Sequence, residues 1–189
     1  MPFKDERTWD FQLGHHRLPA LFNADECRDI VGYHENRDHF PASSTAGGES
    51  YRSTDVFWLN YSEDRHHWIY DRIAQATHEF NDAHYRFEIE ECTNLQLARY
   101  KPGQHYDWHA DLGAEGYSRR KLSLAIMLSS LDDFSGSRLQ FGTGKFIQDA
   151  EMEQGDAIVF PAWQPHRVTP VTDGERWTLV GWWLGPPFR

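Results

Sequence analysis

The sequence predicts an α+β fold in which helices come first and a sandwich or barrel of short strands follows. Two patterns carry this prediction. Before residue 90, apolar residues recur at helical spacing in two segments, whereas from Thr93 onward apolar and polar residues alternate with a period of two. Glycines and an Asp–Gly pair separate the later runs, as turns between strands do. A chain of 189 residues fits one domain.

Two helices are expected in the first half of the chain. Residues 24–35 follow Asn23, a residue type that favours the N-cap position, and their apolar side chains fall near one face. Residues 68–80 repeat this pattern, with Ile69, Ile73 and Phe80 aligned. Both helices therefore have one face that can pack on a sheet.

The segment between the helices divides into a loop and a strand. Residues 40–54 are small and polar around Gly47 and Gly48, so we expect a mobile surface loop that could act as a lid. Residues 55–59 read as a short buried strand. The strands expected after Thr93 cover residues 95–100, 122–129, 138–141, 156–160 and 177–183.

Charge and composition exclude several classes of protein. A net charge of −10 disfavours binding to a phosphate backbone or an anionic membrane, so we expect neither a nucleic-acid nor a membrane partner. The N-terminus leads into no apolar run of secretory type, and no apolar stretch is long enough to span a bilayer, which predicts a cytoplasmic protein. Cys27 and Cys92 form no CxxC motif and are expected to be ordinary buried thiols.

The residues that carry chemistry begin at His109. On an extended strand, His109 and Asp111 point to the same face, and His166 follows a later strand and turn. Two imidazoles and one carboxylate form the facial triad of non-haem Fe(II) oxygenases. Alone, the His-x-Asp pair is a weak signal, since a salt-bridged surface pair would look the same. Arg176 strengthens it, because a buried arginine can hold the distant carboxylate of a 2-oxo acid that chelates the metal.

These motifs resemble a known family. The His109-Ala-Asp111 triplet, the segment from His166 to Arg176 and the closing residues 181–189 resemble Fe(II)/2-oxoglutarate-dependent dioxygenases of the prolyl 4-hydroxylase-like group, of bacterial or phage type. The likeness reaches upstream to about residue 50. It implies a double-stranded β-helix (jelly-roll) core over about residues 91–189, with helical support over about residues 1–90. It also implies Fe(II), 2-oxoglutarate and O2 as cofactor and co-substrates, with ascorbate as a further reductant.

The resemblance assigns roles to individual residues. It implies that His109, Asp111 and His166 are the iron ligands and thus the catalytic centre, and that Arg176 pairs with 2-oxoglutarate. Tyr100 matches a tyrosine whose hydroxyl reaches the co-substrate.

Further residues are expected around that centre. Tyr106 matches a position that faces the primary substrate. Period-two spacing places Gln96 on the face of Tyr100, and Trp182 on the face of Arg176, so both are expected to line the pocket.

Two departures from the family pattern matter. Where some members have a tyrosine beside the basic residue, this chain has Met127, so Ser123 or Thr178 is expected to be the second polar partner of the co-substrate. The basic residue is Arg176, whereas the collagen-type enzymes use lysine, which weakens an assignment to collagen-like peptides.

The function that follows is hydroxylation of a C–H bond, coupled to conversion of 2-oxoglutarate to succinate and CO2. The substrate is a prolyl or other amino-acid side chain in a peptide, or a small molecule. Because Asp111 supplies a carboxylate ligand, hydroxylation is favoured over halogenation.

Two alternatives remain open. One is a catalytically silent jelly-roll protein that binds or senses a metal and a 2-oxo acid, and the other, less favoured, is a nucleic-acid demethylase. The run Arg119-Arg120-Lys121 is expected to be a solvated charge run that would flank the pocket mouth if the substrate were anionic. The identity of the substrate and the oligomeric state stay open.

Overall fold

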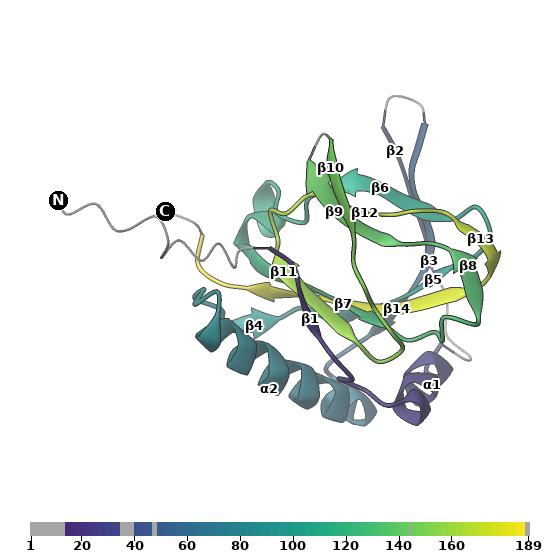
Figure 1. The fold of residues 1–189 in the computed structure, drawn as a ribbon. Coiled ribbons are helices and arrows are strands. Elements are labelled where there is room, and N and C mark those ends of the chain that lie inside the picture. Colours follow the sequence, from purple (N-terminus) through teal and green to yellow (C-terminus); the bar gives the residue numbers. More distant parts are fainter. Residues whose placement is uncertain (1–13, 35–39, 47–48, 144, 188–189) are drawn as a thin grey trace.

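The strands of the described chain form one long, curled antiparallel sheet and a second sheet of two strands. The computed structural model describes residues 14–34, 40–46, 49–143 and 145–187. Its main sheet has the strand order β1-β11-β7-β14-β5-β3-β6-β12-β9-β10, with β2 added to β3 and β4 added to β14. The sheet folds over on itself, so that β6, β12, β9 and β10 lie above β11, β7 and β14 (Figure 1). This is the jelly-roll arrangement that the family resemblance implied.

The helices and strands have the following bounds: β1 (His16–Leu18), α1 (Ala24–Gly32), β2 (Phe40–Ala46), β3 (Glu49–Leu59), η2 (Asp64–His66), α2 (His67–Ala83), β4 (Glu91–Cys92), β5 (Leu95–Tyr100), β6 (His105–His109), η3 (Glu115–Arg119), β7 (Arg120–Met127), β8 (Phe134–Gly136), β9 (Leu139–Thr143), β10 (Phe146–Asp149), β11 (Ala157–Pro161), β12 (His166–Val168), β13 (Val171–Gly174) and β14 (Arg176–Leu184). Strands β8 and β13 pair with each other in a separate two-stranded sheet.

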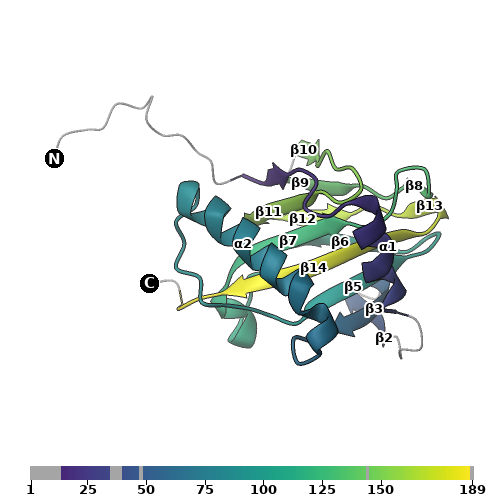
Figure 2. The same cartoon turned by 90° about the horizontal axis from the view of Figure 1, so that it is seen from below.

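Helices α1 and α2 cover the outer face of the layer that contains β11, β7 and β14 (Figure 2). Helix α1 begins where the sequence predicted, because the Asn23 side chain accepts from the Glu26 backbone N–H and the Glu26 carboxylate accepts from the Asn23 backbone N–H. This reciprocal pair satisfies two backbone donors that a helix start leaves open. Both predicted helices are thus confirmed. In the part of the chain that is described, no helix has the length and apolar character needed to cross a membrane.

Alternation along the strands divides the buried side chains into two cores. In β14, Trp177, Leu179 and Trp183 belong to the core under the helices. The side chains that alternate with these face the inside of the jelly roll, where a second core contains Tyr100, Phe160 and other residues of both layers. A period of two therefore gives each central strand one face for stability and one for the interior cavity.

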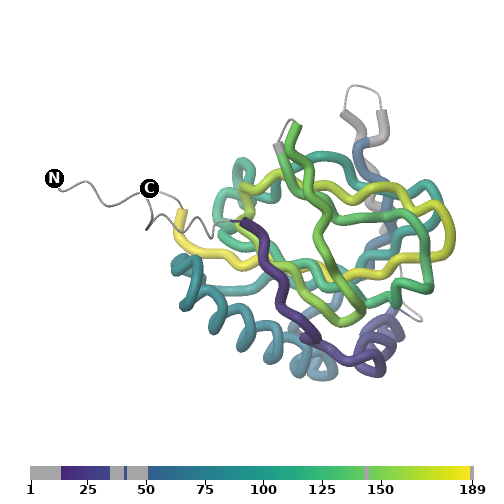
Figure 3. The backbone as a smooth tube through the Cα atoms, viewed as in Figure 1, coloured from purple at the N-terminus to yellow at the C-terminus, as the bar shows by residue number. Residues whose placement is uncertain are grey.

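Two expectations about the first half of the chain need correction. Residues 40–54, expected to be an irregular mobile loop, instead lie mostly in β2 and β3, which pair as a long antiparallel hairpin. Figure 1 shows β2 and β3 side by side and projecting beyond the rest of the sheet. The tube in Figure 3 shows the layers of the sheet with the coil of α2 below them. The segment before residue 90 is also more than helical support, because β3 pairs with β5 and β6 inside the main sheet.

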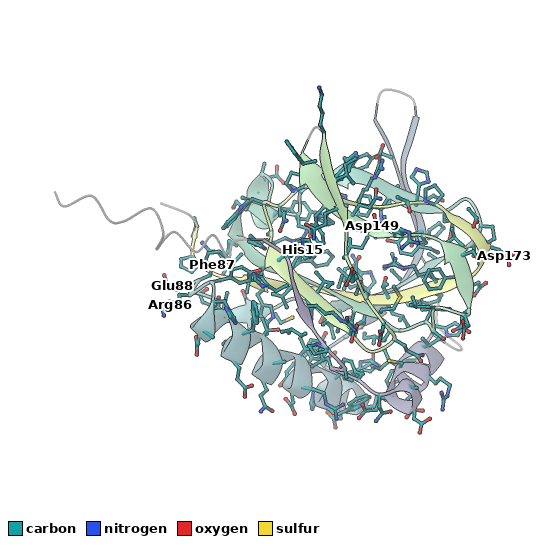
Figure 4. The ribbon with its side chains drawn as sticks, in the orientation of Figure 1. His15, Arg86, Phe87, Glu88, Asp149 and Asp173 are labelled. Carbon is teal, nitrogen blue, oxygen red and sulfur yellow. The ribbon has the colours of Figure 1, made fainter. Side chains whose placement is uncertain are left out.

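Figure 4 marks the two ends of the molecule. Asp173 in β13 lies at one end, and Phe87 and Glu88, in the segment between α2 and β4, lie at the other. Most of the predicted site residues lie on strands of the main sheet, and nearly all of them line one cavity.

Candidate metal and co-substrate site

Pairing of β6 with β12 brings the two predicted histidine ligands together. His109, the last residue of β6, is the register partner of His166, the first residue of β12. The strand ends at His109, so Asp111 lies in the turn that follows rather than on the strand. The Asp111 backbone N–H donates to the carbonyl of Ala162, which fixes the turn. Two histidines that are 57 positions apart in the sequence thus meet by antiparallel pairing.

The three side chains form a cluster that could hold a metal ion. Their candidate ligand atoms all lie within 4.8 Å of one another. The Nε2 atom of His109 is 3.7 Å from Asp111 Oδ1, and the Nε2 atom of His166 is 3.6 Å from Asp111 Oδ2. Each imidazole is held by its other nitrogen, Nδ1, on a backbone carbonyl two residues earlier in the chain, that of Asp107 or Gln164. Both Nε2 atoms therefore face the carboxylate.

Electrostatics keep the cluster in the form that binds a cation. Burial, helped by the nearby His166, lowers the pKa of His109 to about 4, so its imidazole is neutral near pH 7. Burial alone would raise the pKa of Asp111, but the two histidines and the hydrogen bond from Ser123 outweigh burial and lower it. A neutral imidazole and an ionised carboxylate are the protonation states that ligate a divalent metal.

Arg176 lies in the same cavity and has no anionic partner among the described residues. It is 1% exposed, and its Nε and Nη1 atoms are buried without a hydrogen-bond partner. Its register partner on β5 is Tyr100, whose ring centroid is 5.6 Å from the guanidinium carbon. Burial lowers the pKa of Arg176 to about 10, which still leaves it charged near pH 7. A buried cation with unused donors is the feature that a bound carboxylate would complete.

The predicted site residues converge on one cavity of about 290 Å³. Nine of the ten line it, and Ser123 is the exception. The ten are Gln96, Tyr100, Tyr106, His109, Asp111, Ser123, His166, Arg176, Thr178 and Trp182.

Ser123 contacts a predicted ligand rather than the cavity. Its hydroxyl donates to Asp111 Oδ2 over 2.6 Å. Of the two residues expected as a second polar partner for the co-substrate, only Thr178 therefore lines the cavity.

The predicted substrate side of the cavity is aromatic. The Tyr106 ring stacks on the His109 imidazole, with a centroid distance of 3.6 Å and an interplanar angle of 12°. Gln96 accepts a hydrogen bond from Arg52, and the Trp182 ring lies 3.8 Å from the guanidinium carbon of Arg120. Tyr106 and Trp182 thus lie next to the metal-ligand cluster and each carries an arginine against its ring.

Sequence reasoning missed those two arginines, Arg52 and Arg120, as residues that line the site. The run that includes Arg120 was expected to be solvated, yet Lys121 is 5% exposed and Arg120 lines the cavity. A register shift explains this, since Trp183 pairs with Leu122 whereas the next residue of β14, Leu184, pairs with Arg120. Such a bulge re-aims side chains against the period of two. The spacing of the sequence contains no signal for it.

The fold and the cluster define a class of protein: a jelly roll whose interior presents two histidines and a carboxylate to one metal and a buried cation to an acidic co-substrate. Comparison with known proteins agrees. The family model described as the 2OG-Fe(II) oxygenase superfamily matches residues 95–184, which contain all ten predicted site residues. By this segment the chain is similar to the 2OG-Fe(II) oxygenases, and the resemblance to their prolyl 4-hydroxylase-like group that the motifs indicated is confirmed. Fe(II), 2-oxoglutarate and O2 are the cofactor and co-substrates of this family, and the His-Asp-His cluster fits the metal.

Individual relatives extend the comparison. A PKHD-type hydroxylase of Idiomarina loihiensis is 31% identical over 93 residues, which are 49% of this chain and 43% of the relative. The chain thus matches less than half the length of that curated relative. Among solved structures, a Pseudomonas putida prolyl-4-hydroxylase superposes with a TM-score of 0.74 at 21% identity, over 93% of this chain and 95% of the other. A viral collagen prolyl hydroxylase from Paramecium Bursaria Chlorella virus-1 gives a TM-score of 0.71 at 21% identity, over 91% and 96%. These structures show that the fold is shared.

Proposed function

We propose that this chain is a single-domain 2-oxoglutarate-dependent hydroxylase that inserts an oxygen atom into a C–H bond of its primary substrate. One observation carries the proposal: a buried arginine, Arg176, which has no anionic partner in the described part of the chain, lines the same cavity as a His-Asp-His cluster of ligand geometry. Leaving a cation buried and unpaired costs stability, so its presence indicates that a bound anion completes the site.

The metal would be held by His109, Asp111 and His166. When bound, Fe(II) together with 2-oxoglutarate and O2 supplies the oxidising power, so that the substrate C–H becomes C–OH while 2-oxoglutarate becomes succinate and CO2. Three protein ligands leave three positions of an octahedral ion for other groups. The Ser123 hydroxyl, which donates to Asp111 Oδ2, keeps that carboxylate oriented and ionised.

The co-substrate would be oriented by residues of β5 and β14. Arg176 donates to the carboxylate of 2-oxoglutarate that lies far from the metal, and Tyr100 and Thr178 are its polar neighbours on the same cavity wall. Apolar lining residues, among them Leu139 and Phe160, exclude water from the acidic co-substrate. Exclusion of water strengthens the ion pair with Arg176.

The primary substrate would enter on the side of Tyr106, Gln96 and Trp182. We infer an amino-acid side chain, prolyl or other, in a peptide, or a small molecule. The similarity to a PKHD-type hydroxylase and to the fold of a prolyl-4-hydroxylase supports this class. The net charge of −10 supports a substrate other than nucleic acid, and a cytoplasmic location stays a prediction.

The test measures the binding of 2-oxoglutarate to the protein loaded with Fe(II), without O2. Binding is detected by calorimetry and by the visible absorption that develops when a 2-oxo acid chelates Fe(II). We expect one 2-oxoglutarate per chain, loss of metal binding in Asp111→Ala, and at least tenfold weaker 2-oxoglutarate binding with the metal retained in Arg176→Gln. An Arg138→Gln variant, which removes an exposed arginine outside the cavity, serves as control.

Turnover is measured separately as succinate formed in air, with ascorbate as reductant. Failure of the wild-type protein to bind 2-oxoglutarate would remove the proposal. Binding without succinate formation for any amino-acid, peptide or metabolite substrate would instead favour the catalytically silent binding or sensing protein.

A further inference from the structure

The proposed function assigns two arginines of the cavity, Arg52 and Arg120, neither to the metal nor to 2-oxoglutarate. We propose that they form a clamp for an anionic group of the primary substrate, a carboxylate, which sits beside the Tyr106 and Trp182 rings while the reacting C–H faces the metal cluster. This inference rests on the proposed function and narrows its substrate to acidic molecules.

Arg52 is held in place, and among the described residues it has no anionic partner. It extends from β3, where its register partner is Tyr106 on β6, and its guanidinium carbon lies 4.6 Å from the Tyr106 ring centroid. Its Nη2 donates to the neutral Gln96 amide over 3.3 Å, whereas its Nε is buried without a partner. Among the described residues, no carboxylate lies within ion-pair distance of Arg52. The Arg52 guanidinium therefore keeps a buried donor free for a ligand.

Arg120 belongs to a different strand, β7. The bulge at the start of β7 turns it into the cavity, where its guanidinium carbon lies 3.8 Å from the Trp182 ring and 4.5 Å from the Tyr117 ring. Its Nη1 is 3.4 Å from the Asp111 carbonyl oxygen and 3.8 Å from Asp111 Oδ1, a carboxylate that the proposed metal would engage. Stacking of a guanidinium between two rings fixes its plane and the direction of its N–H groups.

The charge of the cavity calls for an anion. Three arginines line it against a single carboxylate, that of Asp111, in a chain whose net charge is −10. The charge of Fe(II) and that of 2-oxoglutarate cancel, so an excess of two positive charges faces the primary substrate. Arg52 and Arg120 line the same cavity, so their two positive charges repel each other across it. A substrate carboxylate would relieve this repulsion.

The chemistry of the two guanidiniums favours a carboxylate over a neutral carbonyl. Planar N–H forks match two carboxylate oxygens, and charge-assisted hydrogen bonds are about twice as strong as neutral ones. A cavity of about 290 Å³ that also contains 2-oxoglutarate leaves room for a compact group. The carboxylate of a small amino-acid derivative or the C-terminus of a peptide would fit this description equally, so the experiment has an arm for each.

The experiment compares each acid with its amide. Protein loaded with Mn(II) and saturated with 2-oxoglutarate, without O2, is titrated in a calorimeter with N-acetyl-amino acids and their carboxamides, N-acetyl-L-proline and N-acetyl-L-prolinamide among them. A second arm uses short prolyl peptides that end in a free carboxylate or in an amide. We expect at least one acid to bind at least tenfold more tightly than its amide. The arm in which it does so identifies the source of the carboxylate.

The variants Arg52→Gln and Arg120→Gln connect the preference to the clamp. Each is expected to reduce the ratio of acid to amide affinity at least fivefold, and the double variant to abolish the preference. Arg138→Gln, with the same loss of charge on the exposed surface, is the matched control and should keep the wild-type ratio. Binding of 2-oxoglutarate is measured in every variant, because it reports whether the cavity is still assembled.

Equal affinity for acids and amides, absence of binding by every acid, or an unchanged preference in the double variant would each overturn the clamp. None of these results would affect the proposed function if 2-oxoglutarate still binds with the metal. Conversely, loss of 2-oxoglutarate binding by the wild-type protein would remove the proposed function itself.

Discussion

At the scale of single residues, the hydrogen bond from Ser123 to Asp111 decides how one metal ligand is presented. Ser123 is fully buried on β7, and its hydroxyl lies 2.6 Å from Asp111 Oδ2. A hydrogen bond of this kind both orients a carboxylate and favours its ionised form. Ser123 is thus a positioning residue, which acts on the metal through Asp111.

We predict that Ser123→Ala weakens the binding of Mn(II) or Co(II) about tenfold, because groups that orient metal ligands typically contribute this much. The affinity is measured by competition with a chelator of known strength. Ser129→Ala is the matched control: Ser129 is also buried, but it bonds to the backbone of Trp177 outside the cavity. It should lower stability by about 1 kcal/mol while leaving metal affinity unchanged. A Ser123→Ala protein that binds metal like the wild type would contradict the positioning role.

A second prediction concerns pH. The pKa of His109 is lowered to about 4 in the folded protein by burial and by His166, from an ordinary value of 6.5. Between these two values the unfolded chain binds more protons than the folded one, so stability falls as the pH falls. We expect the metal-free protein to lose up to about 3 kcal/mol of its unfolding free energy between pH 6.5 and pH 4.

Urea denaturation with a chelator present, at pH 7 and at pH 4.5, checks this loss. His109→Leu should show a smaller decrease, and His78→Asn, which changes an exposed histidine of α2, should show the decrease of the wild type. An undiminished decrease in His109→Leu would assign the effect to other groups.

The sequence predicted those site residues that belong to a short motif or a regular spacing, and it did not predict those whose position depends on the pairing of distant strands. His109, Asp111, His166 and Arg176 were found because a short motif and a spacing carry them, and all four line one cavity. Arg120 was missed because a bulge, set by the pairing of β7 with β14, reverses the face on which it lies. A register shift between strands that are far apart in the sequence leaves no trace in the local pattern.

At the scale of elements, the same distinction separates α1 from the β2–β3 hairpin. Helix α1 was found because its N-cap and its apolar spacing are local. The sequence predicted a loop for residues 40–54 because apolar and polar side chains do not alternate there. The hairpin instead forms through backbone pairing of β2 with β3 and of β3 with β5 and β6. Backbone hydrogen bonds to neighbouring strands determine the conformation of such a segment more than its own side chains do.

The turn before β11 gives a prediction at this scale. Gly155 has φ +86°, its N–H donates to Met127, and its carbonyl accepts from Phe22, so it ties the N-terminal segment to the sheet. A Cβ at this position would lie 1.8 Å from the Phe22 carbonyl oxygen. We expect Gly155→Ala to destabilise the fold by about 2–4 kcal/mol, from left-handed strain and the clash together, and to lower Tm by about 5–15 °C.

Thermal unfolding with and without Mn(II) and 2-oxoglutarate measures this change. Gly116→Ala is the control, because a Cβ there would meet nothing within 4 Å. A Tm of Gly155→Ala within 2 °C of the wild type would mean that the turn can relax without cost.

At the scale of the whole molecule, the two cores perform different tasks. The core under α1 and α2 is apolar, whereas the jelly-roll interior combines apolar walls with the cavity and its three arginines. Arg176, the most deeply buried charged residue among those described, and the buried Asp111 lie where the ligands would bind. Stability and ligand binding are opposed at these positions, since every unpaired buried charge weakens the ligand-free fold.

Arg176 provides the sharpest test of that opposition. Its pKa of about 10, lowered by burial from 12.5, means that the charged form costs the folded protein about 3 kcal/mol near pH 7. This penalty would vanish only above the pKa of the unfolded chain, so it applies over the whole neutral range. We predict that Arg176→Met raises the Tm of the ligand-free protein and abolishes the further increase that 2-oxoglutarate gives to the wild type with Mn(II) bound.

Arg99→Met is the matched control, because Arg99 on the neighbouring strand β5 also lies within the sheet but forms an ion pair with Asp55 over 2.8 Å. Removing it leaves a buried carboxylate with less compensation, so its Tm should fall while the stabilisation by 2-oxoglutarate remains. The decisive comparison is the sign of the two changes in the ligand-free protein. If Arg176→Met lowered Tm as Arg99→Met does, Arg176 would be satisfied within the fold, and its unused donors would no longer indicate a bound anion.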